Sequence, residues 1–332
     1  MKKILVFTVI FVLIVGAVAF GATGGDLWMQ SQTGSIVSSL YRNIQTHFFD
    51  EKTGLYYSFA NDLYNRPAYL WSVAALFQAF DEMQKTSLLK KNDLLENMLT
   101  TINYYYDNVT SISSRDYGGY DSYVVKLGGG ARYYDDNEWL GLALVDAYEI
   151  TDNPIFLSKA EQIFKFIENG YDNKLGGGIY WEEGGNSKNT CSNGPAIVLS
   201  LKLYEITHEA SYLSFAKTVY DWTNEHLLSP EGIYWDHIDL NGHVNKDIFT
   251  YNTGIMIQAM VLLYKITGDQ NYLKQAQKTA ENSLIYFAPN GNFPFWDDGS
   301  FWFNAVLLRG YQSLYETDKS DVKYVDVFSQ WA

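Results

Sequence analysis

Two adjacent aspartates, Asp135 and Asp136, are the side chains of this sequence best suited to acid–base chemistry. They stand at the start of a predicted helix, Asn137 to Ile150, and aromatic residues flank them on both sides. Cleaving a glycosidic bond with retention requires two carboxyl groups roughly 5–5.5 Å apart, one as nucleophile and one as acid and then base. Neighbouring residues at a helix start can present carboxylates at such a separation, and flat aromatic faces suit sugar rings. The pair therefore predicts the catalytic centre of an enzyme that cleaves sugar chains.

The same pair has two plainer interpretations. One aspartate could cap the helix while the other supplies a favourable first-turn charge, or both could bind a cation. Two close carboxyls resist double ionisation, which raises the pKa of one of them, whereas the helix dipole lowers it. We expect proximity and burial to outweigh the dipole, so that one aspartate keeps its proton at the working pH.

The elements that would carry these residues repeat along the chain. Segments of the type Tyr-Glu-Ile-Thr recur around four tyrosines, Tyr148, Tyr204, Tyr264 and Tyr315, which are 56, 60 and 51 residues apart. At the first three, one helix, a short turn and a second helix follow in the same order, because the turn residues are types that end one helix and cap the next. Without an N-terminal leader, which is discussed below, about 310 of the 332 residues remain, and at this period they give between five and six hairpins.

The two helices of each hairpin differ in polarity. The first is apolar around most of its circumference, as at Ile197 to Ile206 and Ile255 to Ile266, which is typical of a buried helix. The second, such as Tyr212 to Leu228, sets charges against one apolar stripe and is expected outside. Tyr69 to Phe80 and Asp93 to Tyr106 fit the same scheme as an inner and an outer helix. The pattern predicts an all-α toroid of helical hairpins.

A glycine–aromatic loop follows each outer helix, in phase with the start of the next inner helix. These loops are expected to gather at one mouth of the toroid, as structural plugs or as the lining of a cleft. Trp181, Trp235 and Trp296 follow loop glycines and are predicted to stack on sugars.

Several polar residues near the inner-helix starts are weaker candidates. Asn137 and Asn193 precede their repeat tyrosines by eleven residues, and Asn252 is offset by one. Such amides could cap helices or recognise hydroxyls, since they both donate and accept. Lys188 could contact a hydroxyl or be a surface lysine. The predicted substrate-binding residues are Tyr134, Asn137, Trp139, Trp181, Lys188, Asn189, Asn193, Trp235, Tyr251, Asn252 and Trp296.

The N-terminus and the cysteine content indicate the compartment. Lys2 and Lys3 precede an apolar run, Ile4 to about Ala22, which is typical of a secretory signal or an uncleaved anchor. We therefore expect export, with residues 1–22 as the leader and residues 23–332 as one catalytic domain. The only cysteine, Cys191, can form no intrachain disulfide and is interpreted as a small packed residue.

The charge balance excludes some partners. A formal net charge of −14 disfavours nucleic acid and polyuronic acids, whose recognition needs clustered Lys and Arg. A neutral oligo- or polysaccharide fits the aromatic content of 17%. The sequence shows neither a phosphate loop nor the Cys/His spacing of a zinc site, so no metal or other cofactor is expected. We expect a monomer, with membrane contact only through an uncleaved N-terminus.

Three motifs resemble those of one enzyme family. Tyr-Tyr-Asp-Asp-Asn-Glu-Trp at 133–139 is similar to the paired-aspartate motif of glycoside hydrolase family 76, the α-1,6-mannanases. The segments at 188–195 and 249–254 resemble that family's later motifs, in its order. The resemblance implies an (α/α)6 barrel and endo-acting, retaining cleavage of α-1,6-linked mannose chains. It assigns the nucleophile to Asp135 and the acid/base to Asp136, and it implies no metal requirement.

Other classes remain open from the residues alone. Phe301-Trp-Phe-Asn-Ala-Val306 departs from the family's usual run, which leaves one end of the cleft and the substrate preference open. A hydrolase of the same fold could act on another neutral α-glycan, and a non-catalytic glycan-binding protein could use the same aromatic ring. Only the aspartate pair argues against the binding protein. An epimerase would want histidines at inner-helix starts, where none of the five histidines falls.

Overall fold

The computed structural model describes residues 26–62, 64–86, 93–108, 118–289 and 300–319. The predicted leader, residues 1–22, and the predicted sugar platform Trp296 lie outside this part of the chain. In the described part the α-helices are α2 (Asp26–His47), α3 (Leu70–Lys85), α4 (Leu94–Asn103), α5 (Tyr134–Thr151), α6 (Pro154–Asn169), α7 (Thr190–Thr207), α8 (Ala210–Leu227), α9 (Thr250–Thr267), α10 (Gln270–Phe287) and α11 (Ser300–Asp318). None of these helices is long and apolar enough to cross a membrane.

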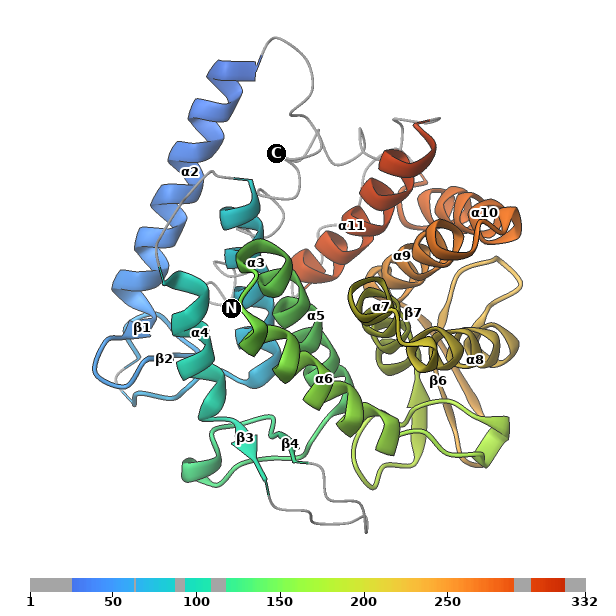
Figure 1. Cartoon of the computed structure of the whole chain (residues 1–332), viewed down its shortest axis with the longest axis horizontal. Helices are drawn as coiled ribbons and strands as arrows, with labels where there is room; N and C mark the ends of the chain where they lie inside the picture. Colours follow the sequence, from blue (N-terminus) through green and yellow to red (C-terminus); the bar gives the residue numbers. More distant parts are fainter. Residues whose placement is uncertain (1–25, 63, 87–92, 109–117, 290–299, 320–332) are drawn as a thin grey trace.

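The helices form two layers, as the alternating polarity predicts. Helices α3, α5, α7, α9 and α11 contact one another in this order and form the inner layer. Helices α4, α6, α8 and α10 each pack on the inner helix of their own hairpin. In Figure 1 the hairpins follow one another around the molecule in the order of the sequence. Arg309 of α11 pairs with Glu82 of α3 at 3.3 Å, which ties the last inner helix to the first.

The repeated Tyr-x-Ile-Thr segments make the same turn three times. The threonine that ends each inner helix donates its hydroxyl to the carbonyl four residues back, at 2.6–2.8 Å. The same oxygen accepts the backbone N–H two residues further on, at 3.2–3.3 Å. The intervening residue has a left-handed backbone and donates its N–H to the carbonyl of the repeat tyrosine. The three threonines are Thr151, Thr207 and Thr267.

Short strands connect the outer helices to the next inner helices. Strands β1 (Phe49–Asp50) and β2 (Leu55–Tyr56) form one antiparallel hairpin, and β3 (Tyr106–Asp107) and β4 (Gly119–Tyr120) form another. Strands β5 (Ser187–Asn189), β6 (Trp235–Asp239) and β7 (Val244–Ile248) form an antiparallel sheet in the order β5-β6-β7. Two 3₁₀ turns, η1 (Val125–Leu127) and η2 (Lys174–Gly176), complete the connections. Because β5 runs directly into α7, this sheet fixes the approach to an inner-helix start.

Asparagine side chains fasten two of these connections to the helix that follows. The amide of Asn137, in α5, donates to the carbonyl of Tyr120 and accepts its N–H, both at 2.9 Å. Asn193, in α7, makes the same pair of bonds with Ile179, at 3.0 and 2.9 Å. Each amide thereby gives one loop residue the pair of backbone hydrogen bonds that a neighbouring strand would otherwise provide. We call this two-bond contact the amide clamp.

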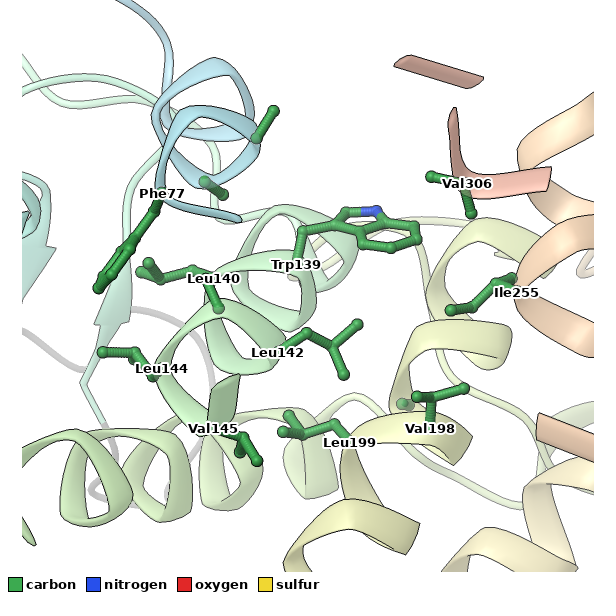
Figure 2. Packing of buried hydrophobic residues seen from close by; sticks show 14 of the residues in the cluster. Phe77, Trp139, Leu140, Leu142, Leu144, Val145, Val198, Leu199, Ile255 and Val306 are labelled. Atoms are coloured by element: carbon green, nitrogen blue, oxygen red, sulfur yellow. The ribbon is translucent and has the colours of Figure 1, made fainter. Parts of the chain in front are cut away.

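The interior is filled where the inner helices meet. Figure 2 shows Leu142 of α5 near Val198 and Leu199 of α7, with Ile255 of α9 and Val306 of α11 beyond them. All five side chains are at most 3% exposed. Such burial of apolar surface is the main stabilising contribution to the barrel.

Helices α9 and α11 approach most closely through two glycines. A Cβ at Gly254 would lie 2.5 Å from the Cα of Leu307, and a Cβ at Gly310 would lie 2.5 Å from the carbonyl oxygen of Gly254. No side chain fits at either position without moving one helix away from the other. The contact requires glycine on both helices.

Candidate active site

Asp135, the second residue of α5, lies on the wall of a cleft of about 570 Å³. The indole Nε1 of Trp181 donates a hydrogen bond to Oδ2 of Asp135 at 3.0 Å. The other oxygen, Oδ1, accepts the backbone N–H of Asp136 at 2.9 Å. Placement in the first turn, where backbone N–H groups are free, accounts for this last bond. Each oxygen of the carboxyl is therefore held by a donor, and the residue still borders the cleft.

The two carboxyls have different environments. Burial raises the pKa of Asp135 to about 6, while hydrogen bonds from Cys191 and Trp181 oppose the rise. Asp136 is only 8% exposed. Burial first, and the nearby charge of Asp135 second, raise the pKa of Asp136 well above its usual range. Such a pair favours one ionised and one protonated carboxyl at neutral pH, which is the distribution that acid-and-nucleophile chemistry needs.

Three other elements complete the cleft. The segment around Trp181 and Glu182 supplies one side, β5 and β6 supply the adjoining wall, and the start of α9 supplies Tyr251. Trp181 is 39% exposed and packs against Tyr133 with ring centroids 4.9 Å apart. Tyr251 packs on Phe303 of α11 at 4.2 Å. Both rings are fixed by neighbours and border open space, so either can support a sugar face.

Two predicted aromatic contacts are corrected by the structure. Tyr134 is 3% exposed and stacks on Phe166 of α6, with centroids 4.9 Å apart. Trp139 is 4% exposed and lies against Trp302 edge-on at 4.8 Å; Figure 2 shows it among the buried side chains. Tyr134 precedes Asp135 by one residue, and Trp139 follows Asp136 by three. At these positions of the helix both rings point into the packed interior, so neither reaches the cleft.

The predicted sugar contact of Lys188 is also wrong. Its side chain is fully buried and its ammonium bonds to Asp172 Oδ1 at 2.7 Å. Further bonds go to the carbonyl oxygens of Asp172, Lys174 and Gly177, at 2.5–3.2 Å. The alternation of side chains in β5 turns Lys188 away from the cleft and its neighbour Asn189 towards it. We call this group of contacts the Lys188 anchor.

The amides divide in the same way. Asn137 and Asn193 are fully buried. One N–H of each side-chain amide donates within the amide clamp, and a further bond goes to the carbonyl four residues earlier, so the donors of both amides are used. These two residues are therefore structural and do not contact a sugar. Asn189 lines the cleft and accepts the hydroxyl of Ser187 at 2.8 Å. It remains a predicted substrate contact.

Asn252 differs from the other repeat amides. Thr253, the residue in register with Asn137, accepts the backbone N–H of Tyr234 at 3.5 Å and so takes the place of an amide clamp. Asn252 is instead in register with Asp136. It is fully buried, and among the described residues neither its amide oxygen nor its nitrogen has a hydrogen-bond partner. Its role in substrate binding remains a prediction.

Trp235 does not belong to the described lining of the cleft. Its ring lies beneath the ammonium of Lys246, 5.0 Å from the centroid. The next residues of β6, Asp236 and His237, face the cleft instead. The ring of Trp181 is therefore the better placed of the two predicted tryptophan platforms.

Residues that the sequence interpretation passed over also line the cleft. Cys191, interpreted as a small packed residue, is 3% exposed and hydrogen-bonds to Asp135. Asp236 pairs with His237, Oδ2 to Nδ1, at 2.8 Å. The pairing of β6 with β7 is irregular between Trp235 and His237, and the adjacent residues Asp236 and His237 both line the cleft, which strand alternation in the sequence does not predict. For Cys191 the signal was its register, thirteen residues before a repeat tyrosine, as for Asp135.

A third carboxyl lies below the pair. Glu138 is fully buried, and no hydrogen-bond partner for its oxygens occurs among the described residues. Burial, with a smaller contribution from the charge of Asp135, raises the pKa of Glu138 well above its usual range. Burial therefore favours its protonated form, which adds no further charge to the pair. The described residues contain no group of three or more His, Cys, Asp or Glu arranged to hold a metal ion.

Comparisons with known proteins relate this chain to one enzyme family. Residues 34–320 match Glycosyl hydrolase family 76. The mannan endo-1,6-alpha-mannosidase of Candida glabrata is 26% identical over 201 residues, which are 55% of this chain and 45% of that protein. The mannan endo-1,6-alpha-mannosidase of Candida albicans is 22% identical over 286 residues, which are 81% of this chain and 60% of that protein. The chain thus spans about half of the length of these curated relatives.

Solved structures extend the likeness to the fold. The GH76 alpha-mannanase of Bacteroides thetaiotaomicron has a TM-score of 0.78 at 28% identity, covering 94% of this chain and 84% of its own. An inactive variant of the alpha-1,6-mannanase of Salegentibacter sp., with two consecutive aspartates changed to alanine, was solved with alpha-1,6-mannotetrose. Its TM-score is 0.71 at 26% identity, over 90% of this chain and 84% of its own. These structures are (α/α)6 barrels, so the predicted fold class is confirmed.

Proposed function

The chain belongs to glycosyl hydrolase family 76, and on this premise we propose that it hydrolyses α-1,6-linked mannose chains with retention, cutting within them. The observation that carries the proposal is the pair of neighbouring carboxyls whose pKa values are both raised by burial but which differ in their hydrogen-bond donors. Asp135 has two side-chain donors and faces the cleft, whereas Asp136 is desolvated and favours its proton. Family membership supports the assignment of the reaction to this pair.

In the first half of the proposed reaction Asp136 acts as the general acid. It gives its proton to the glycosidic oxygen as that bond breaks, and an Asp135 oxygen forms a bond to the sugar carbon. The hydrogen bonds from Trp181 and Cys191 hold Asp135 as the ionised partner. The sugar remains attached to Asp135 as an ester.

In the second half the roles of Asp136 reverse. Its carboxylate, now without a proton, takes a proton from water while the water oxygen attacks the same sugar carbon. The ester bond to Asp135 breaks and both residues return to their starting states. Two displacements at one carbon restore the original configuration.

The cleft also supports a neutral substrate. Asp135, Glu182, Asp236 and Asp239 contribute carboxyls to its lining, and the described lining contains neither lysine nor arginine. A polyanionic chain would be repelled, whereas a mannose chain carries no charge. Trp181 is proposed to support a sugar face, and Asn189 and Tyr251 to bind hydroxyls.

The test is incubation of the purified protein with α-1,6-mannan and a panel of other neutral α-glycans. We expect a ladder of α-1,6-manno-oligosaccharides, with the α-anomer formed first by NMR. Asp135→Asn and Asp136→Asn are each expected to lower kcat at least about 10³-fold, since each removes one half of the mechanism. Unaltered turnover in either variant would refute the assignment, and stronger activity on another glycan would replace the substrate.

Export is proposed on the basis of the N-terminal sequence. Residues 1–22 carry the charged and apolar regions of a secretory signal. Expression of the full chain, followed by fractionation and N-terminal sequencing, is expected to give an exported monomer that starts near residue 23. An intracellular chain retaining Met1 would contradict the proposal.

A further inference from the structure

The helix next to α5 brings a cysteine to the lining of the same cleft as Asp135. Cys191 is the second residue of α7, as Asp135 is of α5 and Tyr251 is of α9. All three precede their repeat tyrosine by thirteen residues, so the barrel brings them to the same level. All three also line the same cleft. Neighbouring inner helices thus present a carboxyl, a thiol and a phenol side by side.

These three groups form a hydrogen-bonded row. The thiol of Cys191 hydrogen-bonds to Asp135 and favours its ionised form, so the S–H is the donor. The hydroxyl of Tyr251 hydrogen-bonds to Cys191 and is held in its protonated form, so the O–H donates to sulfur. Each donor has one proton and one acceptor. The row therefore has a single direction, from Tyr251 through Cys191 to Asp135.

The thiol in this row is neutral. Burial, together with the charge of Asp135, raises the pKa of Cys191 well above its usual range. The cysteine is thus a hydrogen-bond donor and not a competing nucleophile, because only a thiolate attacks readily. Tyr251 is fixed in turn by its packing against the tilted ring of Phe303, with ring centroids 4.2 Å apart.

We propose that Cys191 is a positioning residue for the nucleophile. Its sulfur accepts a hydrogen bond from the Tyr251 hydroxyl, and its S–H donates a hydrogen bond to Asp135, so that the nucleophilic carboxylate keeps its charge and its orientation. This inference rests on the proposed function. A thiol is a weaker donor than a hydroxyl, so it orients the carboxylate while withdrawing little of its electron density. The indole of Trp181 donates to Oδ2 of Asp135 and the backbone N–H of Asp136 donates to Oδ1, so the thiol is a third donor to a carboxylate held at both oxygens.

The experiment is a set of pH profiles of kcat/KM on α-1,6-mannan. Cys191→Ala removes the donor, and Cys191→Ser restores one of similar size. We expect the acidic limb of Cys191→Ala to move to higher pH by about half a unit to one unit, with kcat about 3- to 10-fold lower and KM little changed. The limb of Cys191→Ser is expected within a few tenths of a unit of wild type. Ser200→Ala, a fully buried site further along α7, is the matched control and should leave the limb unmoved.

A double-mutant comparison tests the direction of the row. Tyr251→Phe removes the hydroxyl that orients the thiol, and we expect a smaller shift of the limb in the same direction. Cys191→Ala combined with Tyr251→Phe should shift the limb no further than Cys191→Ala alone, because residues in one row act non-additively. Thermal unfolding of each variant shows that it is folded. Should Cys191→Ala fail to fold, Cys191→Val carries the same comparison.

The outcomes separate the two proposals. An active wild type whose acidic limb moves in Cys191→Ala and returns in Cys191→Ser supports the positioning role. An active wild type whose limb coincides with that of Cys191→Ala overturns this inference and leaves the proposed function standing. A wild type that is inert towards α-1,6-mannan overturns the proposed function and this inference with it.

Discussion

The Lys188 anchor offers the sharpest contrast between a structural and a substrate-binding residue. Lys188→Met keeps the length of the side chain and removes the ammonium. Its four acceptors, one carboxylate oxygen and three carbonyl oxygens, lie at 2.5–3.2 Å. In the variant all four lose the ammonium at once, although Asp172 Oδ1 keeps the backbone N–H of Lys174 and the Lys174 carbonyl keeps that of Gly177.

The cost follows from the burial. Removing one partner of a buried ion pair destabilises a protein by about 3–5 kcal/mol. The side chain of Asp172 is 36% exposed and can recover water, so the lower end, about 3 kcal/mol, applies here. For a chain of roughly 300 residues the entropy of unfolding is about 0.6 kcal/mol per kelvin. The expected fall in Tm is therefore about 5 °C.

Calorimetry and mannan hydrolysis below the transition measure the two effects separately. Lys188→Met should lose about 5 °C in Tm, while kcat/KM stays within about threefold of wild type because the ammonium does not reach the cleft. Lys174→Met is the matched control: this lysine is exposed, with its ammonium 5.9 Å from the Tyr180 ring, and its Tm should change by less than about 1 °C. A tenfold rise in KM at unchanged Tm would refute the reasoning and restore Lys188 as a sugar contact.

Three further predictions concern the cleft and the helix contacts. Trp181→Phe keeps a stacking ring but removes the indole donor to Asp135. Because this donor favours the carboxylate, the pKa of Asp135 should rise further above about 6. The acidic limb of the activity profile should therefore move up by as much as about one pH unit. An unmoved limb would show that this bond does not tune the nucleophile. Gly254→Ala places a methyl 2.5 Å from the Cα of Leu307, so overpacking should lower the stability to urea by about 3 kcal/mol, and a variant as stable as wild type would contradict the close contact. His208→Gly relieves a non-glycine residue at φ 58° and should raise the stability by about 1 kcal/mol in the same assay, whereas a loss would show that the histidine side chain outweighs the strain.

The hairpin repeat could be predicted because it is written into local pattern. The Thr151, Thr207 and Thr267 turns use the same short-range bonds, which the residue types alone indicate. Helix starts were less accessible. Helix α7 begins at Thr190, well before the apolar run from Ile197, because its first turns carry polar residues that hydrophobic periodicity does not detect.

The direction of single side chains was the part that sequence could not supply. Lys188 and Asn189 are adjacent, and only the pairing of β5 with β6 decides which of them faces the cleft. The side-chain amides of Asn137 and Asn193 are of a type that often binds sugar hydroxyls. Both are instead hydrogen-bonded to backbone groups seventeen and fourteen residues earlier in the chain. Cys191 was undervalued because a lone cysteine has no signal of its own outside its register with Asp135.

The amide clamp has a consequence for how such a barrel can change. Each loop backbone is fastened to the helix that comes after it, by a side chain that the loop itself does not provide. Segments between two fastening points can therefore lengthen, shorten or be exchanged while the scaffold stays intact. The loops that line the cleft can therefore change in sequence and length, and new glycan preferences can arise, while Asp135 and Asp136 keep their positions.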